Sequence, residues 1–253
     1  NYISIYIYMR KVVVFDMDET LGHFVQLSMF DYYLTNMYNK KISRSHFFKM
    51  MDMFPKILRP DILNIIKSIK KLKSKDKNIK VFIYTNNTGC KQWVYRIKSY
   101  IEKKVKSKIF DRVICGWKYD DIVIEPNRTG YRKTYEDLLR CGHLSKKDKI
   151  LFLDDKYHEF MIHKNIRYLY LEPYRYNIPC DEFKEKYSKT FKLKENEKDF
   201  LRENIKKCSS RYESSNQQLF KEKSKIIKRE ILDFLKKKKT LKNIKKNNKT
   251  RKI

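Results

Sequence analysis

Residues 11–23 read KVVVFDMDETLGH, an apolar run with three valines that ends abruptly in acidic residues. A short β-branched run of this kind is typical of a parallel strand buried on both faces of a sheet. Where the chain leaves a strand in extended conformation, alternate side chains share a side, so Asp16 and Asp18 should point together and Met17 away. Open α/β sheets bind ligands beyond the carboxyl ends of their strands. We therefore expect a polar site where this strand ends.

The rest of the chain alternates between short apolar runs and stretches with helical spacing. Further strands are expected at residues 80–84 (KVFIY), 112–115, 149–153 (KILFL) and 167–171. Helices are expected where apolar residues recur every three or four positions, at residues 24–38, 46–54, 61–73, 90–105, 133–141 and 219–235. Strands that alternate with helices predict an α/β fold with a Rossmann-like core, in which a mostly parallel central sheet is flanked by helices.

The pattern also predicts how the chain is divided. We expect a core at residues 9–180 with a small helical insertion at 24–57, then a helical extension at 181–235 and a disordered basic tail at 236–253. The insertion is rich in Met, Phe and Tyr. It is either a cap that grips a substrate or a helical hairpin that buries its own apolar side, and we favour the hairpin for most of these side chains. Residues 1–8 are either an extra strand or upstream translation, and no prediction depends on them.

Composition excludes some classes of protein. With 41% hydrophobic residues in 253, the chain can build a core, which excludes wholesale disorder. The absence of any apolar run of about 18 residues predicts no membrane span. Five scattered cysteines predict neither a zinc site nor a disulfide framework, so we expect an intracellular protein, nuclear or cytoplasmic. The abundant Lys, Asn and Ile suggest an AT-rich genome, such as that of a large DNA virus.

The chain carries a formal net charge of +30. Two explanations stay open at this stage: compositional drift, and binding to polyanions such as nucleic acid. The basic tail in turn has three explanations, namely a solvated terminus, a nuclear signal, or an arm that contacts nucleic acid without sequence specificity.

Polar side chains follow three of the expected strands, and a lysine opens the helix at 133–141. The set is Asp16, Asp18, Thr85, Asn86, Lys133, Asp154 and Asp155. Carboxylates that converge on one point repel unless a cation lies among them, and oxygen ligands of this type favour Mg²⁺. A cation, a hydroxyl and a lysine around one carboxylate can neutralise a phosphoryl group. The carboxylate can then attack phosphorus and form an aspartyl-phosphate.

The order of these groups along the chain makes the prediction specific. An Asp-x-Asp pair alone is most often a turn or a helix cap. Receiver domains also gather Asp, Thr and Lys at strand ends, but their lysine comes last in the chain. Here Lys133 precedes Asp154 and Asp155, which argues against a receiver domain.

Taken together, these motifs resemble the haloacid dehalogenase superfamily of phosphohydrolases. DMDETLGH, at residues 16–23, resembles more narrowly the DLDETLVH signature of the phosphatases that act on the C-terminal domain of RNA polymerase II. The other motifs follow in the same order over residues 11–175: LRPDILNII at 58–66, FIYTNN at 82–87, YRKTYEDL at 131–138 and ILFLDD at 150–155.

The resemblance implies a role for each catalytic position. Asp16 would be the nucleophile, and Asp18 would be the general acid and base. Thr85, Asn86 and Lys133 would bind the phosphoryl oxygens and stabilise their charge.

The resemblance also implies a metal site and its surroundings. Mg²⁺ would be held by the Asp16 side chain, the Asp18 backbone carbonyl and Asp155, while Asp154 would support the lysine or the metal-bound waters. Thr20 would brace the loop.

This chain departs from the family pattern at several positions. Gly22 replaces an apolar residue, and Asp155 stands where some members have Asn. The second motif reads TNN, where relatives often have a small residue after Thr. In the family, the arginine that corresponds to Arg59 lies near the site.

The expected activity is Mg²⁺-dependent hydrolysis of phosphomonoesters. An insertion this small would leave the site open to a protein chain, so we expect a protein phosphoserine or phosphothreonine phosphatase with a phosphoprotein or phosphopeptide as partner. A phosphatase of polynucleotide ends, a small-molecule phosphatase, and a scaffold that binds phosphoprotein without turnover remain alternatives.

Overall fold

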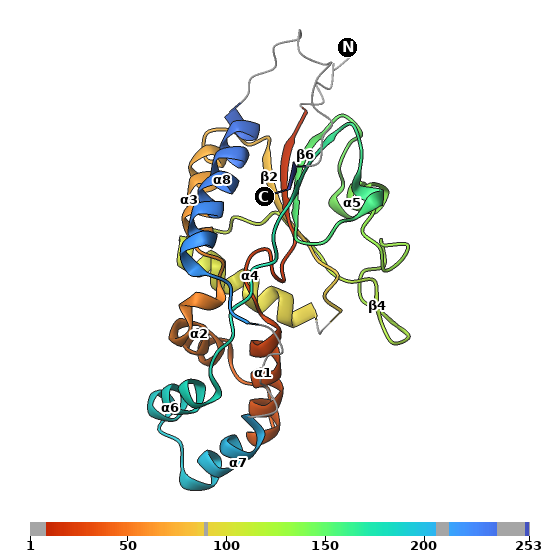
Figure 1. Ribbon diagram of the computed structural model, residues 1–253. Coiled ribbons are helices and arrows are strands. Elements are labelled where there is room, and N and C mark those ends of the chain that lie inside the picture. Colours follow the sequence, from red (N-terminus) through yellow and green to blue (C-terminus); the bar gives the residue numbers. More distant parts are fainter. Residues whose placement is uncertain (1–8, 89–90, 206–212, 237–250, 253) are drawn as a thin grey trace.

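A six-stranded parallel sheet forms the centre of the protein (Figure 1). The computed structural model describes residues 9–88, 91–205, 213–236 and 251–252. The strand order is β3-β2-β1-β6-β7-β8, and every pairing in this sheet is parallel. The strands are β1 (Lys11–Phe15), β2 (Ile79–Tyr84), β3 (Arg112–Ile114), β6 (Lys149–Asp154), β7 (Ile166–Tyr170) and β8 (Arg251–Lys252). The predicted α/β, Rossmann-like class is confirmed.

Strand β1 lies in the middle of the sheet, and its end coincides with the ends of its neighbours. Phe15 pairs with Ile83 of β2 and with Leu153 of β6. The residues that follow these three therefore reach the same edge of the sheet. The five strands expected from the sequence each lie within a residue of their predicted bounds.

The two faces of the sheet bury different helices. Val13 and Phe15 of β1 belong to the core formed with α3 (Ile62–Lys73), α4 (Lys91–Val105) and α8 (Gln217–Lys236). Val12 and Val14 belong to the opposite core, which contains α5 (Tyr135–Gly142). Successive side chains of a strand alternate between faces, so an uninterrupted run of valines supplies both cores.

Four helices gather at the end of the molecule where the site lies, and their apolar side chains join the same core as α3 and α4 (Figure 1). Two belong to the insertion, α1 (Val25–Met37) and α2 (Arg44–Met53), which a short 3-10 turn, η1 (Pro55–Ile57), joins to α3. The other two, α6 (Cys180–Phe191) and α7 (Glu195–Ile205), come from the C-terminal part of the chain and pack on them. Phe30 of α1 stacks on Phe183 of α6 with ring centroids 3.7 Å apart.

The insertion buries most of its apolar side chains, but against other helices and not mainly against itself. The buried ones include Phe30, Phe47, Phe48, Met50 and Met51, whereas Tyr32 is 62% exposed. The two helices of the insertion make few contacts with each other: α1 packs on α7, and α2 packs on α4 and α6. The expected hairpin that buries its own apolar side is therefore not what the structure shows.

Helix α8 returns from this group to the sheet and packs on α3. An ion pair joins its Glu230 to Arg167 of β7, and the Leu235 carbonyl accepts a hydrogen bond from the Lys11 ammonium at 2.7 Å. The expected disordered tail falls mostly on residues 237–250, outside the described part. Its described end differs from that expectation, because Arg251–Lys252 forms β8 and pairs with Leu169 and Tyr170. Strand β7 would otherwise be the edge of the sheet, and β8 covers the end of that edge at Leu169 and Tyr170.

Three smaller features complete the description. A hairpin that the sequence did not predict, β4 (Lys118–Tyr119) with β5 (Ile122–Val123), projects between β3 and α5. No helix in the described part of the chain is long and apolar enough to cross a membrane. The three described cysteines, Cys115, Cys141 and Cys180, are free thiols.

Candidate active site

The residues expected at the strand ends meet at one edge of the sheet. The backbone N–H of Asp16 donates to the Leu153 carbonyl at 2.8 Å, so sheet pairing continues into the first motif. In the same way, the N–H of Thr85 donates to the Ile114 carbonyl at 2.9 Å. Backbone hydrogen bonds of the sheet thus hold the first residue of both motifs in place, independently of their side chains.

Lys133 forms the electrostatic centre of the site. It directly precedes Thr134, which caps α5 by accepting a hydrogen bond from the Asp137 N–H. Its ammonium lies 2.5 Å from Asp16 Oδ1 and 2.6 Å from Asp154 Oδ2, and its side chain is 1% exposed. A charged lysine can be buried this deeply because two carboxylates compensate its charge.

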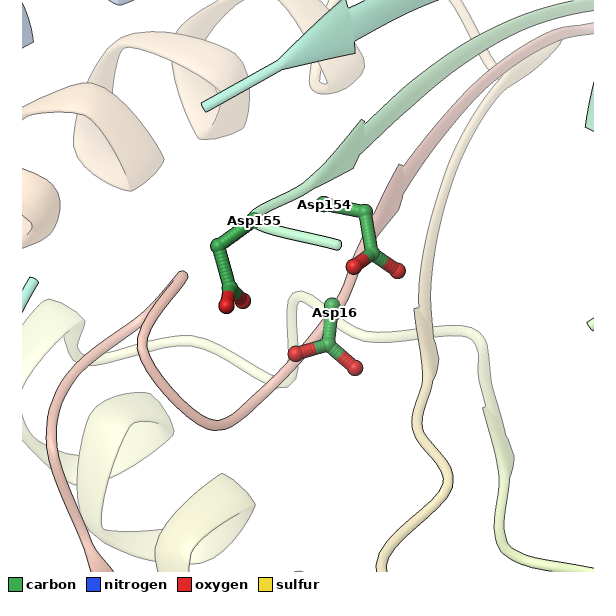
Figure 2. Close-up of side chains that lie close together, drawn as sticks. All are labelled: Asp16, Asp154 and Asp155. Atoms are coloured by element: carbon green, nitrogen blue, oxygen red, sulfur yellow. The ribbon is translucent and has the colours of Figure 1, made fainter. Parts of the chain in front are cut away.

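Three carboxylates converge beside this lysine. Figure 2 shows Asp16 and Asp154 at the ends of adjacent strands with Asp155 next to them. One oxygen from each lies within 4.8 Å of the others, and all three residues are buried. One lysine does not balance three negative charges, so the donor set suits a small divalent cation.

The three carboxylates have different partners. Besides Lys133, Asp154 contacts His158 Nε2 at 3.2 Å and accepts a hydrogen bond from the Lys156 backbone at 2.9 Å. Asp155 accepts one from the Thr20 hydroxyl at 3.2 Å. Asp154 therefore positions Lys133 together with Asp16, and all three carboxylates are candidate cation ligands.

Burial controls the acidity of this cluster. It raises the pKa of Asp16 well above the usual range despite the opposing Lys133 ammonium, and it raises the pKa of Asp155, with Asp154 adding to the effect. For Asp154, burial also acts upward, but Lys133 and His158 outweigh it and lower the pKa. A buried group whose charge is disfavoured in this way gains from a cation nearby.

Asp18 lies beside the cluster in a different setting. Its Oδ2 accepts a hydrogen bond from the Asn87 amide at 3.1 Å. Burial raises the pKa of Asp18 to about 6, against the lowering effect of Asn87. Both protonation states of Asp18 are therefore accessible near neutral pH, as a general acid and base requires. Burial likewise raises the pKa of the adjacent Glu19 to about 7.

The loop after β2 carries Thr85, Asn86 and Asn87. The Thr85 hydroxyl accepts a hydrogen bond from the Asn87 N–H at 3.0 Å, which holds the loop in a tight turn. The Asn86 side-chain oxygen is bound by the Arg128 guanidinium at 2.8 Å. The structure thus brings Asn87, rather than Asn86, into contact with the expected acid.

Arg128 connects this loop to the segment before Lys133. It is 3% exposed and donates to the Thr85 carbonyl at 3.2 Å, and also to the carbonyls of Tyr131 at 3.1 Å and Arg132 at 3.0 Å. A planar guanidinium with several donors can hold such a set of acceptors, and a lysine cannot. Arg128 therefore sets the distance between the Thr85 loop and Lys133.

Arg59 lies near the site as expected, but it holds the loop and not the cluster. Its buried guanidinium donates to the carbonyls of Thr20, Glu19 and Glu172, each at 2.7 Å. These bonds clamp the loop that follows β1 to the segment after β7. Arg59 thus fixes the position of Thr20, which in turn contacts Asp155.

At Gly22 the structure has no room for a side chain. A Cβ at Gly22 would lie 2.6 Å from the Ile57 carbonyl oxygen and 2.8 Å from the Phe24 ring. The loop and the segment before α3 therefore approach each other backbone to backbone.

Three residues of the site were not identified from the sequence. Asn87 stands in the TNN motif, but the sequence does not show which of the two asparagines contacts Asp18. His158 follows the acidic pair by three residues, which is a weak signal. Arg128 belongs to no motif, and no feature of the sequence singles it out.

Comparisons with known proteins add a structural neighbour. No protein-family model and no curated protein sequence matches the chain. Among solved structures, the chain is similar to a HAD-superfamily hydrolase, subfamily IA, variant 1, from Geobacter sulfurreducens PCA. The identity is 14%, the TM-score is 0.29, and the match covers 60% of this chain and 81% of that one. The TM-score is too low for this similarity to assign a function.

Proposed function

We propose that this protein hydrolyses phosphomonoesters through an aspartyl-phosphate, in the manner of the haloacid dehalogenase superfamily that its motifs resemble. The observation that carries the proposal is the cluster at the strand ends. There Asp16, Asp154 and Asp155 place carboxylate oxygens within 4.8 Å of one another, and Lys133 lies between two of them.

The first half of the reaction uses Asp16 and Asp18. An oxygen of the Asp16 carboxylate attacks phosphorus, the bond from phosphorus to the alcohol oxygen breaks, and Asp18 gives its proton to that oxygen. Lys133 and Thr85 bind the phosphoryl oxygens as charge shifts onto them.

The second half reverses these roles. A water molecule attacks the phosphorus of the aspartyl-phosphate, and Asp18 takes the proton of that water. The bond from phosphorus to Asp16 breaks, which regenerates the carboxylate and releases inorganic phosphate. The sum is one ester and one water converted to one alcohol and one phosphate.

The metal would be Mg²⁺, held by Asp16 and Asp155. When bound, it would neutralise phosphoryl charge and offset the repulsion within the acidic cluster. Asp154 would keep Lys133 in place beside it.

The substrate we propose is a phosphoserine or phosphothreonine protein. The likeness of DMDETLGH to the signature of C-terminal-domain phosphatases supports this choice. The net charge of +30 is compatible with an acidic phosphopeptide, but it would suit a polynucleotide equally well and does not decide between them.

The test is hydrolysis of an aryl phosphate with Mg²⁺ or with EDTA, followed by a panel of phosphopeptide, 5′- and 3′-phosphorylated oligonucleotide, and sugar phosphate. Asp16→Asn should lower turnover by at least about 1,000-fold while the circular dichroism spectrum stays native. Asp121→Asn, which changes an exposed carboxylate on the β4–β5 turn, should not. Equal activity in wild type and Asp16→Asn would refute the proposed nucleophile, and preference for an oligonucleotide would refute the protein substrate.

A further inference from the structure

A groove of about 620 Å³ opens beside the site, between α1, α4 and the loop after β2. Ser28 and Thr35 of α1 line it on one side, Gln92 of α4 on another, and residues 86–88 at the end nearest the cluster. Its volume falls in the range of about 300–1,000 Å³ that is typical of binding sites.

Asn87 connects this groove to the chemistry. It lines the groove, and its amide also donates to Asp18 Oδ2 at 3.1 Å. In the proposed reaction, Asp18 protonates the oxygen of the departing alcohol. The alcohol part of the substrate therefore lies on the Asp18 side of phosphorus, where the groove begins.

The charge of the groove argues against a polynucleotide in it. Its two cations are Lys41 and Arg96. Arg96 is paired with Asp31 at 2.9 Å, and Lys41 contacts the side-chain oxygen of Gln92 at 3.3 Å. A nucleic-acid backbone needs several uncompensated cations along its path, and this lining offers almost none.

The remaining lining suits a polypeptide. Amide and hydroxyl side chains can both donate to carbonyls and accept from N–H groups, which are the groups that an extended backbone presents. Tyr32, at 62% exposure, adds an aromatic surface for a side chain of the bound peptide. Residues 28–35 of α1 span roughly 10 Å, the length of about three extended residues.

We propose that this groove binds the polypeptide that flanks the phosphorylated Ser or Thr, with α1 and α4 as its walls. The inference rests on the proposed function, because it assigns the leaving-group side of the same site. It makes the α1–α2 insertion a specificity element for a short stretch of peptide.

The test blocks the groove with Thr35→Trp and uses Asn36→Trp as control. Asn36 is the next residue of the same helix and is exposed, and it does not line the groove. The readout is the ratio of kcat/KM for a phosphopeptide to kcat/KM for an aryl phosphate, which has no peptide to place in the groove. Thr35→Trp should lower this ratio at least about tenfold, and Asn36→Trp should leave it unchanged.

A second measurement separates this inference from the proposed function. This measurement is equilibrium binding to the Asp16→Asn variant, so it needs no turnover. Adding Thr35→Trp to that variant should raise the Kd of the same phosphopeptide at least about tenfold. An unchanged Kd and an unchanged ratio would overturn the groove assignment even if hydrolysis is found. If Thr35→Trp weakened the binding of a phosphorylated oligonucleotide and left phosphopeptide binding unchanged, the assignment of a polypeptide to the groove would be overturned. Absence of aryl phosphate hydrolysis in the wild type would refute the proposed function and leave the binding result to decide the groove.

Discussion

Replacing Lys133 with methionine would test the centre of the site. The side chain is 1% exposed, and its ammonium bonds both Asp16, at 2.5 Å, and Asp154, at 2.6 Å. Asp154 and Asp16 outweigh the effect of burial and raise the pKa of Lys133, so it is charged at all ordinary pH values. Methionine keeps a similar length and removes the charge.

The expected loss of stability follows from the two carboxylates left without a cation. Breaking a buried ion pair by removing one partner costs about 3–5 kcal/mol. For a chain of this size each kcal/mol lowers Tm by about 2–4 °C, so Lys133→Met should melt about 6–20 °C below the wild type in EDTA. Added Mg²⁺ should stabilise the variant more than the wild type, because the cluster of carboxylates then lacks its internal cation.

Urea unfolding followed by fluorescence of Trp93 and Trp117 would measure the effect, with and without Mg²⁺. Lys156→Met is the matched control, because Lys156 is exposed next to the same cluster and contacts Asp154 through its backbone N–H, which the substitution keeps. The control should change the free energy of unfolding by less than about 0.5 kcal/mol. A loss below about 1 kcal/mol for Lys133→Met in EDTA would show that Lys133 does not hold the carboxylates together.

Three further predictions concern other parts of the fold. Arg128→Lys keeps the charge but loses the planar guanidinium that holds the Thr85 loop. The kcat/KM for an aryl phosphate should therefore fall about 10–100-fold while the circular dichroism spectrum stays native. Unchanged kinetics would show that Arg128 does not position the site. Burial lowers the pKa of His46 to about 4, below the value of about 6.5 in the unfolded chain. The unfolded state therefore binds the proton first as pH falls, and stability should drop between about pH 6.5 and 4 by about 1–2 kcal/mol after allowance for partial exposure. Urea titrations should show a shallower dependence in His46→Gln, and an equal slope would contradict this. Gly22→Ala should cost about 1–3 kcal/mol, because its Cβ would press on the Ile57 carbonyl, and an unchanged urea midpoint would show that the loop yields freely.

The sequence was sufficient to predict five of the six strands of the sheet and the place of its polar edge. The runs KVVVF, KVFIY and KILFL identify buried parallel strands because both faces of such strands must be apolar. Polar residues directly after each run, namely Asp16, Thr85 and Asp154, could be placed at one edge because parallel strands end on the same side. The prediction needed only local pattern and the geometry of strands.

The tertiary structure alone decided which residues contact across long separations in the sequence. Arg128 lies 43 positions from Thr85 yet binds its carbonyl, and Phe183 stacks on Phe30 although the two belong to segments predicted as separate parts. The pairing of Arg251–Lys252 with β7 likewise depends on an edge that exists only once the sheet is assembled. Such contacts depend on where the topology brings each segment, and a local pattern of apolar and polar residues carries no information about that.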